Sequence, residues 1–359
     1  MTAPLAGGAN VGEGAAILDQ EATYERLDAA GMGPLIAGLG DQIRTAWARG
    51  RAWEPPSGFT TPSRVVVVGM GGSAIGADIA STLARLGSEI PVEVVRNYVA
   101  PPSAEGTLTV GSSVSGNTEE TLEAYGRALG GPGMQLAITK GGKLAGLGGP
   151  TLTYEWGGHP RAALGWGLMP LVAVLTRLGV LDLGDEEVES GASAVDATAI
   201  ACGREMPVEA NPAKQIALRL QGTLPVFVGT DFLEVAARRW AGQMQENAKQ
   251  WAFSVALPEM DHNFLNGFGL PASRGGLHVV FLDADVAHPR NRRRVELTGV
   301  ALDEAGVAHS RETVGGATAL EAILRACALG DWVSFYLSML NGVDPSDTSP
   351  IETFKERMG

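Results

Sequence analysis

Short apolar runs alternate with longer segments of helical periodicity over most of the chain. Residues 64–68 contain four consecutive valines, and apolar positions then recur at helical spacing over residues 73–85. The same patterns predict further strands at residues 92–95, 108–110 and 134–139, and a helix at 118–129. Buried strands that alternate with helices are typical of a parallel sheet covered on both faces.

A second alternation begins after a helical middle region. Helices are predicted at residues 164–178, 185–202 and 213–221. Strands follow at residues 224–228, 253–257 and 277–282, with helices at 231–251, 291–305 and 317–341. The second half therefore repeats the plan of the first. Ligands on such sheets bind at the carboxyl ends of the strands.

The start of the chain predicts two amphipathic helices over residues 15–48, broken near residues 31–33, and a Pro-rich linker at 53–63. We therefore expect an α/β protein with two flavodoxin-like or Rossmann-like sheet domains. The expected parts are an N-terminal tail with helices (1–63), a first sheet domain (64–160), connecting helices (161–210) and a second sheet domain (211–359).

The stretch LTVGSSVSGNTEE, residues 108–120, joins a predicted strand to a predicted helix through small hydroxyl residues. Such a turn aims backbone N–H groups and hydroxyls at one point. A helix N-terminus can hold a phosphate in this way without Lys or Arg. The alternative is an ordinary turn in which Asn117 or Thr118 caps the helix.

The stretch GMGGSAIG, residues 69–76, repeats this design at the end of an earlier strand. Its first, third and sixth positions also satisfy the dinucleotide pattern G-x-G-x-x-G/A. However, the next strand ends in Arg96 and Asn97, where that pattern requires an acidic residue. Ser73 adds a hydroxyl at the helix start, which favours a single phosphate. A tight turn packed with small residues is the structural alternative.

The predicted helix at residues 231–251 carries a candidate base. Glu246 lies roughly opposite an apolar stripe formed by Leu233, Ala236, Trp240, Met244, Ala248 and Trp251. A glutamate in such a position usually faces solvent. Gly242, one turn earlier, costs about 1 kcal/mol relative to Ala within a helix and would permit close approach of another surface. A carboxylate in a covered crevice has a raised pKa and can act as a base.

The histidines differ in their surroundings. His262 lies in the loop PEMDHNF between polar neighbours, which argues against a core histidine. His278 falls in a predicted strand and is expected to be buried, whereas His288 and His309 are expected in surface loops. No pair has the spacing of metal ligands, so no metal is predicted.

Arg161 and the C-terminal segment are the remaining candidates. Arg161 precedes an apolar helix, where an arginine can form a structural ion pair or stabilise an anionic intermediate. The residues SPIE, 349–352, read as a capping box with Pro at the first helical position. Thr348 then marks the start of a helix and Lys355 is solvated. A docked C-terminal helix would instead deliver both side chains to a site.

Composition restricts the class of protein. The 359 residues are 45% hydrophobic and 19% charged, with a net charge of -13, which suits a globular protein and disfavours nucleic acid as a partner. The cluster RNRRR at residues 290–294 is expected to be a solvated loop or helix start. Cys202 and Cys327 give no disulfide framework or zinc pattern and fit a reducing, cytoplasmic location. No signal peptide is recognised, and apolar stretches are expected to stop short of a membrane span.

The motifs GMGGSAIG, SVSGNTEET, QENAK, PEMDHN and a C-terminal T-x6-K together resemble the bifunctional phosphoglucose/phosphomannose isomerases. These are two-domain sugar-isomerase (SIS) proteins of the phosphoglucose isomerase superfamily. The resemblance runs from about residue 65 to the C-terminus. It implies two SIS-type domains, no cofactor and a homodimer with a shared active site. It also implies interconversion of fructose 6-phosphate with glucose 6-phosphate and mannose 6-phosphate through a cis-enediol.

The resemblance further implies roles for single residues. The substrate phosphate would be held by Gly72, Ser73, Ser113, Ser115 and Thr118. Glu246 would shuttle a proton between C1 and C2, and His262 of the other subunit would open the sugar ring. Arg161 would stabilise the cis-enediolate, and Lys355 would assist near the ring oxygen. Thr348 would leave room for the mannose epimer.

Two other functions stay open at this point. Regulatory SIS modules bind sugar phosphates and lack the base, and the presence of Glu246, His262 and Lys355 argues against that class. A nicotinamide enzyme built on GMGGSA is the third possibility, which the missing ribose carboxylate weakens.

Overall fold

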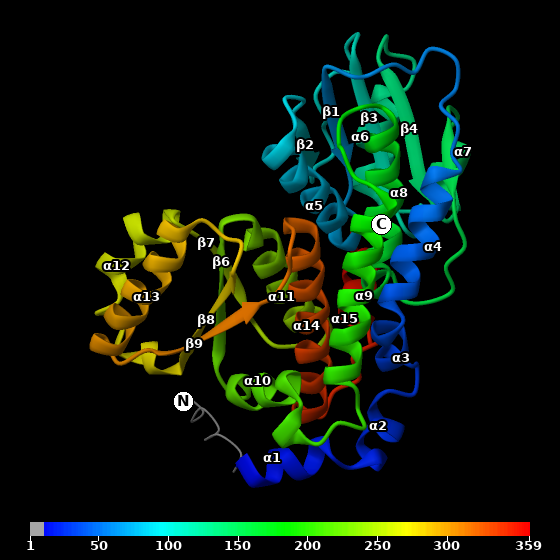
Figure 1. Ribbon diagram of the computed structural model, residues 1–359. Helices are drawn as coiled ribbons and strands as arrows, with labels where there is room; N and C mark the ends of the chain where they lie inside the picture. The colour runs from blue at the N-terminus through cyan, green and yellow to red at the C-terminus, as the bar shows by residue number, and fades with distance from the viewer. Residues whose placement is uncertain (1–10) are drawn as a thin grey trace. The chain divides into compact units, whose positions relative to one another are not determined.

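The computed structural model describes residues 11–359 and contains two parallel sheets flanked by helices (Figure 1). The first sheet has the strand order β2-β1-β3-β4-β5, and the second has the order β7-β6-β8-β9. Every strand pair is parallel. The order β7-β6-β8-β9 corresponds to β2-β1-β3-β4, so the prediction of an α/β protein with two similar parallel sheets is confirmed.

Contacts along the chain divide the described residues into two compact units. The first unit comprises residues 38–196 and 318–321 and holds the first sheet. The second unit comprises the residues up to Ala37, together with 197–317 and 322–359, and holds the second sheet. The helical segment before Gly38 therefore packs with the C-terminal half of the chain, whereas the helix that follows it belongs to the first unit.

The first unit is built around β1 (Arg64–Val68), which lies between β2 (Val92–Val95) and β3 (Thr107–Ser113). The four valines of β1 are buried, as expected for a central strand covered on both faces. The sheet continues through β4 (Met134–Thr139) and β5 (Thr151–Thr153). The helical elements are α4 (Leu39–Arg51), α5 (Gly71–Gly87), α6 (Glu119–Ala128), α7 (Gly142–Gly146), η1 (Pro160–Ala162) and α8 (Leu164–Arg177).

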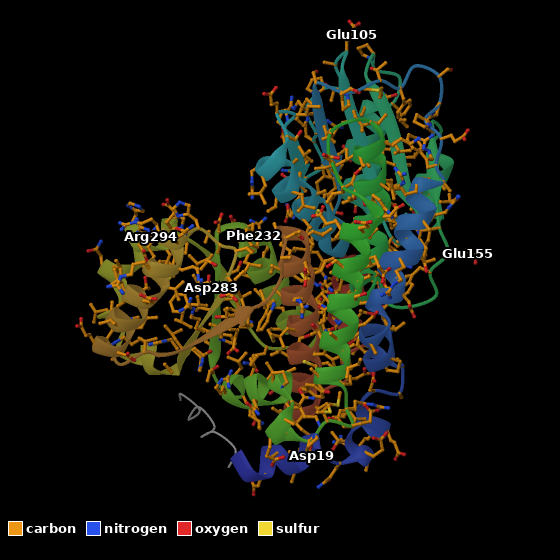
Figure 2. All side chains as sticks on the ribbon, viewed as in Figure 1. Asp19, Glu105, Glu155, Phe232, Asp283 and Arg294 are labelled. Carbon is orange, nitrogen blue, oxygen red and sulfur yellow. The ribbon has the colours of Figure 1, made fainter. Side chains whose placement is uncertain are left out.

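The second unit contains β6 (Leu224–Thr230), β7 (Phe253–Leu257), β8 (Leu277–Ala284) and β9 (Ala308–Val314). Its helices are α1 (Val11–Leu18), α2 (Glu21–Leu27), α3 (Met32–Ala37), α10 (Pro212–Leu220), α11 (Glu234–Asn247), α12 (Phe264–Gly267), α13 (Pro289–Glu304), α14 (Ala319–Leu340) and α15 (Ser349–Met358), with α9 (Asp185–Cys202) leading into it. Side chains fill the space between its sheet and helices (Figure 2). Trp240 of α11 packs against Phe227 of β6, and its indole N–H donates to the Ala326 carbonyl oxygen of α14 at 2.7 Å.

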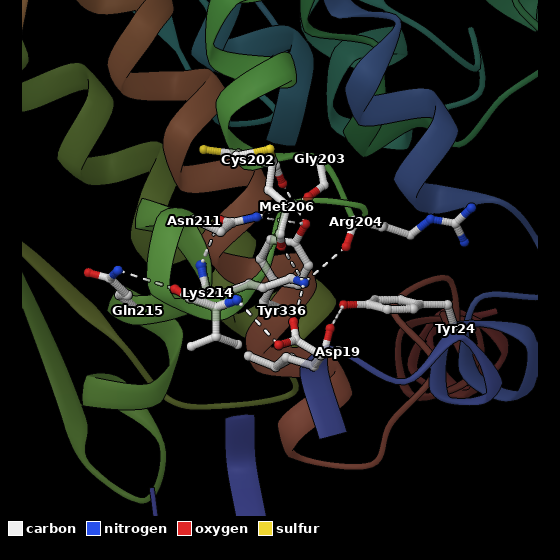
Figure 3. Close-up of polar contacts among 12 residues, drawn as sticks. Asp19, Tyr24, Cys202, Gly203, Arg204, Met206, Asn211, Lys214, Gln215 and Tyr336 are labelled. Atoms are coloured by element: carbon white, nitrogen blue, oxygen red, sulfur yellow. Dashed lines mark hydrogen bonds and ion pairs between the residues drawn. The ribbon is translucent and has the colours of Figure 1, made fainter. Parts of the chain in front are cut away.

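A buried lysine lies at the start of α10 (Figure 3). Lys214 is fully buried, and its Nζ donates to Asp19 Oδ1 at 2.8 Å and to the carbonyl oxygens of Arg204 and Met206 at 3.0 and 2.8 Å. Its Nζ also lies 5.5 Å from the centre of the Tyr336 ring. This network joins α10 and α14 to the chain between α1 and α2, far away in the sequence.

Several predicted boundaries were wrong. Residues 15–48 belong to four short helices, α1 to α4, in place of two. The strands β5 and β9 were not predicted. The predicted helix at 231–251 begins as a 3-10 turn, η3 (Asp231–Leu233), and α11 ends at Asn247. Lys249 then adopts a φ of 54°, which ends the helix without a Gly or Pro in the sequence to mark it.

Helix α14 is long and apolar enough to cross a membrane, by length and composition only. In the structure, 89% of its most apolar window is buried, as in the core helix of a globular protein. Arg325 and Gly330 interrupt its apolar stretches, as expected from the sequence, and the helix is a core element.

Candidate active site

The two predicted Ser/Gly turns come together at the carboxyl ends of the adjacent strands β1 and β3. Ser73 lies in the first turn of α5, and its Oγ accepts a hydrogen bond from the Val114 N–H at 3.2 Å. Ser113 Oγ lies 3.0 Å from Thr118 Oγ1 and 3.5 Å from Ser115 Oγ. The four predicted hydroxyls therefore belong to one cluster, which we call the hydroxyl cradle (Ser73, Ser113, Ser115 and Thr118).

The capping alternative for this turn is only partly realised. Thr118 is the N-cap residue of α6, but its side chain makes no capping hydrogen bond to the helix. Its hydroxyl contacts Ser113 instead. Gly116, with a φ of 67°, lies so close to the loop after β4 that a Cβ there would lie 1.8 Å from the Gly141 carbonyl oxygen. The turn thus needs glycine, and the Ser113 and Ser115 hydroxyls also accept hydrogen bonds from the Gly116 and Asn117 N–H groups at 3.1 and 3.2 Å.

Arg161 lies beside the cradle. It is buried within η1, which packs against α5. A Cβ at Gly72 would lie 3.3 Å from the Pro160 carbonyl oxygen, so the turn before Arg161 touches the turn that starts α5. Because Gly72 has no side chain, the segment that contains Pro160 can pack closely against it. The first unit accordingly brings together Gly72, the hydroxyl cradle and Arg161.

Glu246 belongs to the second unit and lies in the last turn of α11, where it is partly exposed. Within the described chain, nothing lies within 4 Å of a Cβ built at Gly242, so close approach at that glycine remains a prediction. Trp251, which was expected in the apolar stripe, is 75% exposed because the helix ends before it.

Lys249 was not predicted as part of the site. Its Nζ donates to the carbonyl oxygen of Glu246 at 2.6 Å and to that of Asp347 at 2.9 Å. Lys249 therefore joins the turn that carries Glu246 to the segment that carries Thr348. The signal available in the sequence was its place in the motif QENAK, three residues after Glu246.

His262 is exposed at the end of the 3-10 turn η4 (Glu259–His262), which follows β7. The preceding Asp261 accepts hydrogen bonds from Arg294 Nη1 and Thr298 Oγ1, both at 2.8 Å. These contacts fix η4 on α13. A mainly apolar cavity of about 350 Å³, lined by residues that include Met260 and Phe264, lies next to this turn.

The C-terminal helix differs from the prediction. Thr348, not Ser349, is the N-cap residue of α15, and it makes no side-chain capping bond. The Thr348 hydroxyl donates to Glu352 Oε1 at 2.6 Å. The helix therefore starts one residue earlier than predicted, and the predicted capping box at Ser349 is not formed. Lys355 is exposed on α15.

The other histidines are accounted for by the fold. His278 is buried in β8, as predicted, and burial together with Arg219 and His309 lowers its pKa to about 4. His288 is exposed as the N-cap of α13, whose first turns contain the cluster RNRRR. His309 was expected in a surface loop but lies in β9, 3.2 Å from Asp303.

The carboxyl end of the second sheet carries charges in place of hydroxyls. Asp283, labelled in Figure 2, is buried at the end of β8 and accepts hydrogen bonds from Thr230 Oγ1 at 3.2 Å and Arg311 Nε at 3.0 Å. Arg292 Nε lies 3.4 Å from the same carboxylate. This edge is therefore filled by internal ion pairs.

A family model and the sequences of known relatives both identify the same family. Residues 209–358 match the bacterial phospho-glucose isomerase C-terminal SIS domain. A bifunctional phosphoglucose/phosphomannose isomerase from Caldicellulosiruptor bescii is 33% identical over 332 residues, covering 90% of this chain and 97% of that protein. The one from Aquifex aeolicus is 33% identical and covers 85% and 94%. In fold, the chain is similar to the C-terminal domain of glucosamine-fructose-6-phosphate aminotransferase from Francisella tularensis, with a TM-score of 0.68 at 14% identity, covering 87% of this chain and 96% of that one.

Proposed function

Because the chain belongs to the bifunctional phosphoglucose/phosphomannose isomerase family and is an isomerase, we propose that it interconverts fructose 6-phosphate with glucose 6-phosphate and mannose 6-phosphate. The observation that carries this proposal is the hydroxyl cradle. Its hydroxyls and the N-terminus of α5 meet at one point. Such a site suits a phosphate ester held without a basic side chain.

The proposed reaction moves one proton between C2 and C1 and a second proton between their two oxygens. With the phosphate in the cradle, His262 opens the sugar ring, and Glu246 removes the proton from C2 of the aldose. The electron pair of the broken C2–H bond forms a double bond between C1 and C2, and the carbonyl π electrons move to O1, which gives a cis-enediolate that Arg161 stabilises by its positive charge. Glu246 then returns the proton to C1 while the proton of the C2 hydroxyl passes to O1, so that C2 becomes the carbonyl carbon of the ketose.

Lys355 and Thr348 complete the proposed site. The Lys355 ammonium group assists near the ring oxygen, where charge changes as the ring opens. Thr348 is short, so it leaves room for the hydroxyl of either C2 epimer. A site that combines Glu246 with Thr348 is supported by Lys249, which links the Glu246 turn to the segment before Thr348.

We further propose that the active protein is a cytoplasmic homodimer in which His262 serves the site of its partner. The exposure of His262 supports this arrangement. Mixing Glu246→Gln protein with His262→Asn protein, after subunit exchange, should restore activity that neither variant has alone. Absence of restored activity in verified mixed dimers would mean that each chain completes its own site.

A coupled assay tests the function itself. Purified protein supplied with glucose 6-phosphate or mannose 6-phosphate at millimolar concentration should produce fructose 6-phosphate. A ligand-dependent rise in melting temperature without turnover of either aldose would instead identify a sugar-phosphate-binding regulator.

A further inference from the structure

A lysine follows α11 at a position where other helices of this chain have glycine. Five helices are followed, two residues beyond their last residue, by a glycine whose φ lies between 67° and 78°. These helices are α6, α8, α10, α13 and α14, with Gly130, Gly179, Gly222, Gly306 and Gly342. Lys249 has the same position after α11, with a φ of 54°. Because a Cβ disfavours a positive φ, glycine would stabilise this turn, and the lysine side chain is expected to have another use.

The Lys249 side chain makes two hydrogen bonds of different kinds. Its Nζ donates to the Glu246 carbonyl oxygen at 2.6 Å and to the Asp347 carbonyl oxygen at 2.9 Å. A helix leaves its last four carbonyl groups without partners inside the helix, and a cation there also interacts favourably with the helix dipole. The bond to Glu246 therefore caps α11. The bond to Asp347 reaches the segment before α15, which capping does not require.

Other side chains already fix the end of α11 within its unit. Asn341, directly after α14, donates to the Ala248 carbonyl oxygen at 3.0 Å. Gln250 Nε2 donates to two carbonyl oxygens at and beyond the end of α10, at 3.1 and 2.9 Å. These bonds hold the turn on α10 and α14 independently of Lys249. What Lys249 adds is its bond to Asp347, 98 positions further along the chain.

We propose that Lys249 is a positioning residue that sets the separation of Glu246 and Thr348, at the expense of a less favourable backbone conformation. This inference rests on the proposed roles of Glu246 and Thr348. The base acts at C1 and C2 of the sugar, and Thr348 lies beside the C2 hydroxyl. Both side chains must therefore keep one register, although they come from segments that only the folded chain brings together.

Two substitutions of Lys249 separate positioning from stability. Lys249→Gly and Lys249→Met both lose the bond to Asp347, so kcat should fall roughly 10–100-fold in each. The ratio of kcat/KM for glucose 6-phosphate and mannose 6-phosphate should move towards one, because Thr348 is less firmly held. Amides of residues 345–352 should exchange hydrogen faster, as measured by mass spectrometry. Lys249→Gly should nevertheless have the higher urea midpoint of the two, since glycine relieves the positive φ.

Two further variants serve as controls. Lys249→Arg keeps a cationic donor and should retain the wild-type ratio of the two aldoses. Gly306→Lys places a lysine at the same position after α13, where nothing in the described chain lies within 4 Å of a Cβ. It should lower the urea midpoint and leave kcat unchanged, which measures the effect of a lysine in this conformation alone.

The outcomes that overturn the proposal are distinct from failure of the proposed function. Wild-type kcat and a wild-type aldose ratio in both Lys249→Gly and Lys249→Met would show that Lys249 only caps α11. Losses of kcat that follow the order of the urea midpoints, with unchanged hydrogen exchange of residues 345–352, would show the same. If the wild-type chain converts neither aldose, the proposed function fails, and hydrogen exchange still tests the link between Lys249 and Asp347.

Discussion

Ser73 and Val114 are 41 residues apart in the sequence, yet the Val114 N–H donates to Ser73 Oγ at 3.2 Å. This bond joins the first turn of α5 to the loop after β3. The two halves of the hydroxyl cradle are thereby held together by the protein itself. A site that is ordered before its ligand arrives loses less conformational entropy on binding.

Loss of one cradle hydroxyl should weaken phosphate binding. Ser113→Ala removes the hydroxyl that contacts both Thr118 and Ser115. A hydrogen bond to a charged group contributes about 1.5–3 kcal/mol, so we expect roughly 10–100-fold weaker binding of fructose 6-phosphate by calorimetry. Ser81→Ala is the matched control, since Ser81 lies in α5 but its hydroxyl donates to the Val92 carbonyl oxygen. Equal affinities for the two variants would contradict the cradle.

Glu246→Gln should separate binding from chemistry. The amide keeps the size of the side chain but cannot accept the C2 proton, so kcat should fall by at least ~10²-fold. Affinity for the phosphate should stay near that of the wild type, because the cradle is unchanged. Glu234→Gln provides the control on the same helix, since Glu234 forms an exposed ion pair with Arg238 at 3.1 Å. Turnover by Glu246→Gln near the wild-type rate would remove Glu246 as the base.

His278 should make folding stability depend on pH. Its pKa is lowered to about 4 by burial first, and then by the charges of Arg219 and His309. Between its ordinary pKa near 6.5 and this value, the unfolded chain binds a proton that the folded chain does not. The free energy of unfolding should therefore fall as the pH drops from about 6.5 to 4, by about 3 kcal/mol in all.

Urea unfolding at several pH values measures this effect. His278→Gln should be less sensitive to acid over that window than the wild type. His288→Asn, which keeps a capping side chain at an exposed position, should follow the wild-type pH dependence. If His278→Gln and the wild type lose stability in parallel, His278 does not cause the loss.

The sequence predicted the parts of this molecule that local pattern controls. Ser113, Ser115 and Thr118 lie within six positions of one another, so one strand-to-helix turn was enough to group them. The Asp331 partner of Arg239 lies 92 residues away, inside an apolar helix. Its signal was a carboxylate in a segment too apolar to tolerate an unpaired charge. The periodicity of the sequence cannot identify the partner of such a group, because only the packing of α11 against α14 brings Arg239 and Asp331 together.

The N-terminal helices show a second limit of pattern. Four short helices have the same hydrophobic periodicity as two longer ones, so periodicity does not show where one helix ends and the next begins. The helix ends depend on side chains that bond to the backbone. Asp28 illustrates this, since its oxygens accept from the Met32 and Gly33 N–H groups at 2.5 and 3.0 Å and so cap α3. An aspartate in a helical pattern can equally face solvent. The tertiary environment decides between these outcomes.

The Lys214 network should respond unequally to removal of its two ends. Asp19→Ala leaves a fully buried ammonium group with only carbonyl oxygens around it, and an uncompensated buried charge costs roughly 3–5 kcal/mol. Lys214→Met leaves Asp19, whose side chain is 38% exposed and can be hydrated. The loss is then that of the hydrogen bonds to the Arg204 and Met206 carbonyls, roughly 1–3 kcal/mol. Removing the more exposed partner should therefore destabilise the protein more.

Urea unfolding of both single variants and the double variant measures this difference. Asp19→Ala combined with Lys214→Met should be no less stable than Asp19→Ala alone, because the stranded charge is gone. A larger loss for Lys214→Met than for Asp19→Ala would mean that water compensates the buried ammonium group when Asp19 is removed. In that case, the ammonium group of Lys214 would not hold the start of α10 to the chain between α1 and α2.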